Sequence, residues 1–194
     1  MKIACIVEGD GEVQALPALL HRLHQWRTPN TSPPIIERPI RVRRDQFLNK
    51  PVEFDRHLQL AAMKCGADGW ILILLDADDD CPQKLGGNIL QDARQIIPHR
   101  PISVVLANRE YEAWFIASAA ALQASGHFAI PAQGKIPAAE SPRDAKGWVK
   151  EHMVSGVYGE TIEQLALTRH MDLVQVFANS RSFRKLCSEW DKQV

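Results

Sequence analysis

Six consecutive apolar residues, Trp70 to Leu75, constrain the fold of this chain more than any other segment. A run without a polar side is typical of a β-strand that is buried on both faces, as parallel strands between two layers of helices are. The runs Ile3 to Val7 and Ile102 to Ala107 have the same character. The sequence therefore predicts a sheet with parallel central strands.

Segments in which apolar residues recur at helical spacing separate these runs. They cover residues 13–26, 52–65, 82–97 and 111–122. One more strand is expected where Ile40 and Val42 alternate with Arg41 and Arg43. Strands and helices thus alternate, which favours a doubly wound α/β sheet with helices on both faces.

The composition changes after Gly126, where prolines and glycines mark a long loop. We expect residues 1–125 to form the sheet domain, and residues 126–194 to form a loop and a helical C-terminal extension packed on it. Within this tail, Ser141-Pro142 and the pair Thr161 and Gln164 have the pattern of helix starts.

The composition excludes several classes of protein without indicating a function. The 23 basic and 23 acidic side chains cancel, so the net charge predicts no partner. The four cysteines form no Cys-x-x-Cys pair, which argues against a zinc cage and is compatible with reduced thiols. Acidic residues interrupt the first apolar run, and no apolar stretch is long enough to span a bilayer. We expect a cytoplasmic protein that does not bind membranes.

Basic residues cluster locally despite the balanced total charge. Arg38, Arg41, Arg43 and Arg44 lie close together, and Arg22 and Arg27 lie on the preceding predicted helix. Such a stripe could follow the phosphates of a polynucleotide, although a solvated face of the protein is the competing interpretation.

Four acids, Asp76 and Asp78 to Asp80, follow the central strand within five positions. Side chains alternate along a strand, so Asp76, Asp78 and Asp80 should share one face while Asp79 points away. Mutual repulsion of such carboxylates is relieved by a cation, and hard oxygen ligands suit Mg²⁺ or Mn²⁺. An acidic loop that caps the next helix is the alternative.

The other strand ends carry acids as well. Glu8 follows the first strand, and Glu110 and Glu112 follow the strand that ends at Ala107. Since parallel strands bring their carboxyl ends to one edge, we expect Glu8, Asp76, Asp78 and one later glutamate to surround one or two divalent ions. Glu112 also fits a helix-start acid, and for Glu12 we favour that role.

The segment Val7-Glu8-Gly9-Asp10-Gly11-Glu12 and the later Asp76-Ala77-Asp78 resemble the Toprim signature. Toprim domains occur in type IA and type II topoisomerases, bacterial primases and overcoming-lysogenization-defect nucleases. Together with Glu8 to Glu12, the segments Arg109 to Trp114 and Ser180 to Phe183 resemble a family of small Toprim-like bacterial proteins of uncharacterised function.

The resemblance implies roles for individual residues. Glu8 matches the Toprim glutamate proposed as a general acid/base or metal ligand, and Asp76 and Asp78 match the Asp-x-Asp metal ligands. Glu112 is preferred to Glu110 as a further ligand, because the aromatic motif around it recurs in the family. Proteins of this kind often occur beside ATPases in bacterial defence loci, which makes an ATPase a possible partner.

We therefore expect a divalent-metal-dependent nuclease or phosphodiesterase that acts on nucleic acid. Its catalytic residues would be Glu8, Asp76, Asp78 and Glu112, with Asp80 as an additional ligand of Mg²⁺ or Mn²⁺. One alternative is a non-catalytic regulatory subunit with a Toprim-like shape. Another is a nucleotide-sugar transferase, which also uses Asp-x-Asp but does not call for Glu8 at the first strand end.

Overall fold

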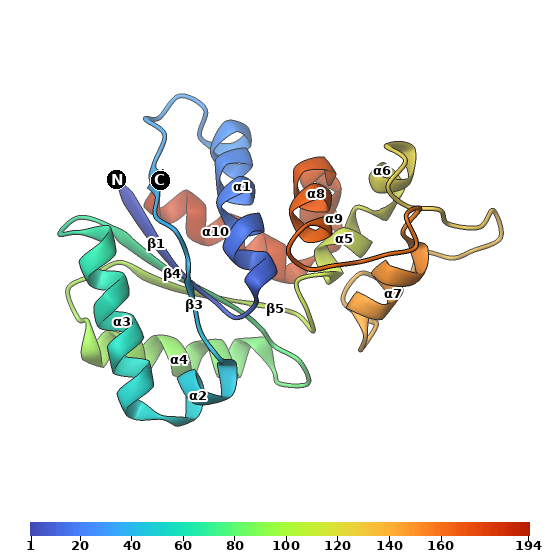
Figure 1. The fold of residues 1–194 in the computed structure, drawn as a ribbon. Coiled ribbons are helices and arrows are strands. Elements are labelled where there is room, and N and C mark those ends of the chain that lie inside the picture. The colour runs from blue at the N-terminus through green and yellow to red at the C-terminus, as the bar shows by residue number, and fades with distance from the viewer.

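The structure, a computed structural model, describes residues 1–194 and contains one parallel sheet. Its long strands are β1 (Lys2–Val7), β4 (Trp70–Asp76) and β5 (Ile102–Ala107). The short strands β2 (Ile35–Ile36) and β3 (Ile40–Arg41) both pair with β1, β2 at its start and β3 at its end, so the order is β2-β1-β4-β5 with β3 also on β1 (Figure 1). The predicted α/β class with parallel central strands is confirmed.

Helices cover both faces of this sheet because its strands are apolar on both sides. Alternate residues of β4 face different cores, Trp70, Leu72 and Leu74 on one side and Ile71, Ile73 and Leu75 on the other. The helix α1 (Asp10–Arg27) packs on the first side. The helices α2 (Arg44–Asn49), α3 (Pro51–Cys65) and α4 (Pro82–Ile96) pack on the second (Figure 1).

The rest of the chain is helical and gathers on the α1 side (Figure 1). It forms α5 (Ala113–Ala117), α6 (Ala119–Ala124), α7 (Ala145–His152), α8 (Glu163–His170), α9 (Leu173–Asn179) and α10 (Arg181–Gln193). The helix α8 packs on α1, and α10 packs on β5. The ring of Trp190 meets that of Trp70 edge-on, with centroids 6.2 Å apart. The tail and the sheet therefore share one hydrophobic core.

Three local predictions are corrected. The expected helix over residues 111–122 is interrupted at Ser118, whose hydroxyl accepts a hydrogen bond from the N–H of Asp172 (2.7 Å). Ser141 does not cap a helix, since its hydroxyl donates to the carbonyl of Ala138, and Asp144 caps α7 instead. Thr161 forms no capping box, because α8 begins at Glu163 with no side-chain cap.

The path of the chain places a reversal of strand order at the carboxyl ends of β1 and β4. From β1 the chain moves outward to β2 and β3, then crosses to the other side of β1 and forms β4 and β5. Strand order thus reverses between β1 and β4, and ligand sites in open parallel sheets lie at the carboxyl ends of such strands. Glu8 and Asp76 occupy these two ends.

No helix of the protein combines the length and apolarity needed to cross a bilayer.

Candidate functional site

The end of β4 is attached to the chain that follows β5. Asp76 is the last residue of β4, and its Oδ1 accepts a hydrogen bond from the N–H of Tyr111 at 2.8 Å. Trp70, Leu72 and Leu74 face the α1 side, so the alternation of the strand directs Asp76 to that side as well. The side chain of Asp76 therefore lies between β1, α1 and the start of α5.

Four carboxylates influence one another at this place. Burial raises the pKa of Asp76 well above its ordinary value, and the charges of Glu112, Glu12 and Glu8 raise it further. Burial also raises the pKa of Glu8, with Asp78 next in effect, while the Arg44 guanidinium opposes the shift. A shared excess of negative charge in a partly dry site is the condition that a bound cation relieves.

Glu8 has the least satisfied carboxyl group of the four. Its Oε2 atom is buried and has no hydrogen-bond partner. Buried polar oxygens in folded proteins nearly always have a partner, which can be a bound ion. Glu8 is thus the residue with a free oxygen to offer a ligand.

The other two glutamates are already hydrogen-bonded. Glu112 is 4% exposed, its Oε1 accepts from the Tyr158 hydroxyl at 2.8 Å, and burial is the main cause that raises its pKa to about 7. Glu12 accepts from the N–H of Gly9 and from the Gln164 amide. The bond to Gly9 confirms the predicted helix-start role of Glu12, and its charge also acts on Asp76.

The remaining aspartates leave the sheet at a turn. Because β4 ends at Asp76 and Asp78 has a left-handed backbone (φ 49°), strand alternation does not extend to residues 78–80. Asp78 and Asp80 form ion pairs with Arg44 at 3.4 and 2.6 Å. Asp79 pairs instead with Arg109 and Arg143. Asp78 and Asp80 therefore lie on the Arg44 side of Glu8, while Asp76 is coupled to Glu112 and Glu12.

A pocket of about 400 Å³ opens beside Glu8, and we call it the acid–arginine pocket. Glu8 and Asp78 line it together with Arg41, Arg43 and Arg44. Three residues of the predicted basic stripe thus meet two residues of the predicted acidic site. Two others do not, since Arg22 donates to the carbonyl of Thr168 and Arg27 pairs with Asp191.

No three His, Cys, Asp or Glu side chains form a ready-made set of metal ligands. The donor chemistry nevertheless fits a hard divalent cation, because Glu8 has an unpartnered buried oxygen and its charge acts on Asp76, whose pKa is also raised. Glu8 and Asp76 are the residues that would hold such an ion first. The carboxylates of Glu12 and Glu112 could join only by changing their present hydrogen bonds.

Sequence reasoning missed Tyr158 and Gln164. Tyr158 binds Glu112, and Gln164 binds Glu12 across 152 positions of the chain. The Oε1 atom of Gln164 is buried without a partner of its own. The spacing of Thr161 and Gln164 indicated only a helix start, and no spacing pattern places either residue in the site, because both reach it from the tail through tertiary packing.

Two of the segments that carry the narrower family resemblance, Arg109 to Trp114 and Ser180 to Phe183, meet in space. The indole N–H of Trp114 donates to the Ser182 hydroxyl at 2.9 Å, and Ser182 donates to Glu140 at 2.8 Å. Glu140 also accepts from Ser180 and from the Asn108 amide, and these hydrogen bonds lower its pKa against the opposing effect of burial. This Glu140 cluster (Asn108, Glu140, Ser180 and Ser182) joins β5, the loop before α7 and the start of α10.

Residues 7–190 match the family model DUF4276, described as a domain of unknown function. The chain belongs to this family. The match begins at the last residue of β1 and includes Glu8, the end of β4, the Glu140 cluster and most of α10, so it extends over both the sheet region and the helical tail. Neither the comparison with curated proteins nor the comparison with solved structures finds a match.

Proposed function

We propose that this DUF4276 protein is a divalent-metal-dependent phosphodiesterase of nuclease type. The supporting observation is the unpartnered, buried Oε2 of Glu8 beside Asp76, where the strand order reverses. The resemblance to Toprim domains adds to this, since it assigns metal-ligand roles to Glu8, Asp76 and Asp78. Mg²⁺ or Mn²⁺ is the proposed cofactor, and it would neutralise charge on a phosphate and lower the pKa of a water molecule.

The residues of the chain divide this work between them. Glu8 and Asp76 hold the ion. Asp78, which now forms an ion pair with Arg44, supplies a further carboxylate beside Glu8. Glu112 completes the acidic surroundings and stays linked to the Tyr158 hydroxyl, so the tail of the protein orients one wall of the site. Asp80 pairs with Arg44 and is the least direct of the proposed ligands.

The acid–arginine pocket supports a phosphodiester of nucleic acid as the substrate. Arg41, Arg43 and Arg44 lie around Glu8 and Asp78, so positive groups adjoin the acids within a single pocket. Arginine binds phosphate oxygens through several N–H groups at once, whereas the acids would repel a phosphate in the absence of a cation. Hydrolysis there would join a water oxygen to phosphorus and release the oxygen of the leaving nucleotide.

A cleavage assay with matched variants tests this proposal. The purified protein is incubated with single- and double-stranded DNA and RNA in Mg²⁺, in Mn²⁺ and in EDTA. We expect metal-dependent cleavage that falls at least about 100-fold in Asp76→Asn, a change that keeps the acceptor for the Tyr111 N–H. Asp79→Asn is the control, because Asp79 pairs with Arg109 and Arg143 away from Glu8.

Equal activity of the two variants would refute the assigned site. Absence of cleavage of all four substrates would refute the nuclease, provided that an ATPase encoded beside the protein also restores no activity. The same preparations report on metal directly, since a bound ion should raise the melting temperature of the wild type and of Asp79→Asn but not of Asp76→Asn.

A non-catalytic subunit is the second candidate, and one observation favours it. The structure contains no preassembled set of three metal-ligating side chains. Calorimetric titration with Mg²⁺ and Mn²⁺ separates the two candidates, because undetectable binding at millimolar metal would favour a role in binding an ATPase or nucleic acid. The nucleotide-sugar transferase is the weaker alternative, since it gives Glu8 no function.

A further inference from the structure

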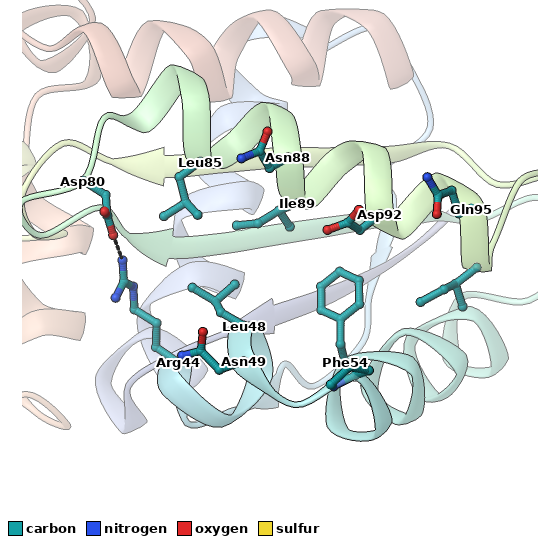
Figure 2. A pocket seen from close by; sticks show the side chains of 12 residues that line it. Arg44, Leu48, Asn49, Phe54, Asp80, Leu85, Asn88, Ile89, Asp92 and Gln95 are labelled. Carbon is teal, nitrogen blue, oxygen red and sulfur yellow. Dashed lines mark hydrogen bonds and ion pairs between the residues drawn. The ribbon is translucent and has the colours of Figure 1, made fainter.

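A groove of about 550 Å³ runs between α4 and the pair α2–α3, next to the candidate site (Figure 2). Its floor is apolar and is formed by Leu48, Phe54, Leu85 and Ile89. The Phe54 ring points from α3 into the groove, toward the part of α4 that carries Asp92 (Figure 2). The volume is in the range of sites that hold small molecules, roughly 300–1,000 Å³.

The rim of the groove is polar and exposed. Asn88, Asp92 and Gln95 project from α4, and Asn49 from the end of α2 (Figure 2). Figure 2 draws no hydrogen bond or ion pair between these four side chains and the other residues shown, and all four residues are exposed. Exposed amide and carboxylate groups thus surround an apolar floor.

Arg44 connects the groove with the acid–arginine pocket. It lines both cavities, and its ion pair with Asp80 stands at one end of the groove. A group bound in the groove would therefore be a neighbour of a phosphate held by Arg44, Arg43 and Arg41. A long peptide or helix lying in the groove would have to cross the Arg44–Asp80 pair.

We propose that the groove binds one unpaired nucleobase of the nucleic-acid chain whose phosphate occupies the acid–arginine pocket. The inference rests on the proposed function for the identity of the ligand. The flat face of a base matches the apolar floor and Phe54, as bases stack on aromatic side chains in single-strand sites. The base edge carries donors and acceptors that asparagine, glutamine and aspartate side chains recognise.

The polar rim also argues against other occupants. The carboxylate of Asp92 would repel a second phosphate but accepts hydrogen bonds from the amino group of a base. A paired base cannot present its Watson–Crick edge to the rim. The groove therefore specifies a single-stranded or locally unpaired nucleotide next to the phosphate that is cleaved.

Nuclear magnetic resonance tests the groove without metal or cleavage. The four ribonucleoside 5′-monophosphates are titrated in EDTA while the side-chain amide signals of Asn49, Asn88 and Gln95 are followed. We expect at least one nucleotide to shift these signals, whereas inorganic phosphate shifts only signals near Arg41, Arg43 and Arg44. Asn88→Trp places a large side chain in the groove and should raise the dissociation constant of that nucleotide at least about tenfold.

Gln91→Trp is the matched control, since Gln91 is an exposed amide of α4 that does not line the groove. It should leave the affinity within about twofold. The proposal is overturned if about 10 mM nucleotide, enough to fill a millimolar site, leaves the three amides unshifted. It is also overturned if the two tryptophan variants bind alike. Neither outcome depends on cleavage, so a failure of the groove is distinguishable from a failure of the nuclease.

Discussion

At the scale of single residues, the acids at the carboxyl ends of the strands are arranged at a cost to stability. The Oε2 atom of Glu8 is buried without a partner, and the pKa values of Glu8, Asp76 and Glu112 are all raised, mainly by burial. An unsatisfied buried polar group costs about 1–3 kcal/mol. Groups with perturbed pKa values in a cleft are typical of functional sites, although ion-pair networks also produce them.

The raised pKa of Glu112 predicts that the metal-free protein loses stability as the pH rises. In the folded state this pKa is about 7 instead of 4.5, so the folded protein binds more protons than the unfolded chain between these values. The protonated Glu112 carboxyl group thus contributes up to about 3 kcal/mol to the free energy of unfolding. This contribution is fully present below pH 4.5 and is lost as the pH rises past 7. Urea unfolding in EDTA between pH 5 and 8 measures it.

The variant Glu112→Gln is the control for this effect, because its amide oxygen still accepts from the Tyr158 hydroxyl. Its unfolding free energy should depend less on pH than that of the wild type, with a remaining slope from Glu8 and Asp76. Identical slopes in the two proteins would show that Glu112 does not titrate in this range.

At the scale of secondary-structure elements, two close contacts attach the tail helices to the sheet. One is the Glu140 cluster at the start of α10, where Ser180 caps the helix. The other is the approach of α8 to α1 at Gly11, which brings Gln164 to Glu12. The second contact supports the candidate site directly, because Gln164 donates a hydrogen bond to Glu12.

Removal of the Glu140 carboxylate should loosen the start of α10. In Glu140→Ala the backbone N–H and hydroxyl of Ser182 lose their acceptor, and we expect a loss of about 2–3 kcal/mol in urea unfolding. Glu151→Ala on α7 is the control, since Glu151 is exposed and should change stability by less than about 0.5 kcal/mol. Similar losses in both variants would contradict a role for the cluster.

Alanine at position 11 should separate α8 from α1. A Cβ atom there would lie 1.6 Å from Oε1 of Gln164 and 2.8 Å from the carbonyl of Glu160, so Gln164 would have to leave Glu12. We expect Gly11→Ala to cost about 1–3 kcal/mol of unfolding free energy. Gly87→Ala in α4 meets nothing within 4 Å and should instead stabilise by about 0.5–1 kcal/mol. An unchanged free energy of unfolding in Gly11→Ala would show that the contact between α8 and α1 is loose.

At the scale of the whole molecule, one core includes residues from both ends of the chain. A cluster of 35 buried residues joins Ile3 and Trp70 of the sheet to Phe183, Leu186 and Trp190 of α10. Such residues lose their burial if either part is removed. The boundary at residue 125 thus separates two stretches of sequence that share one core. A truncated chain tests whether residues 1–125 fold alone.

A chain that ends at residue 125 should fail to fold cooperatively. It would expose the side of Trp70 and Leu72 that α10 and its neighbours cover, and burial of each large apolar side chain contributes about 1.5–3 kcal/mol. Circular dichroism during urea titration measures cooperativity, with the chain of 194 residues as the reference. A sharp unfolding transition of the shortened chain would establish residues 1–125 as an independent domain.

The sequence by itself determined the α/β class, the three long strands and the acids at the ends of β1 and β4. These features depend on periodicity and on the residues that directly follow a strand, both of which are local. Only the tertiary structure decided that β4 ends at Asp76, that Arg44 pairs with Asp78 and Asp80, and that Tyr158 and Gln164 reach the site. Long-range packing makes these contacts, one of them across 152 positions, and no spacing along the chain encodes which side chains it brings together.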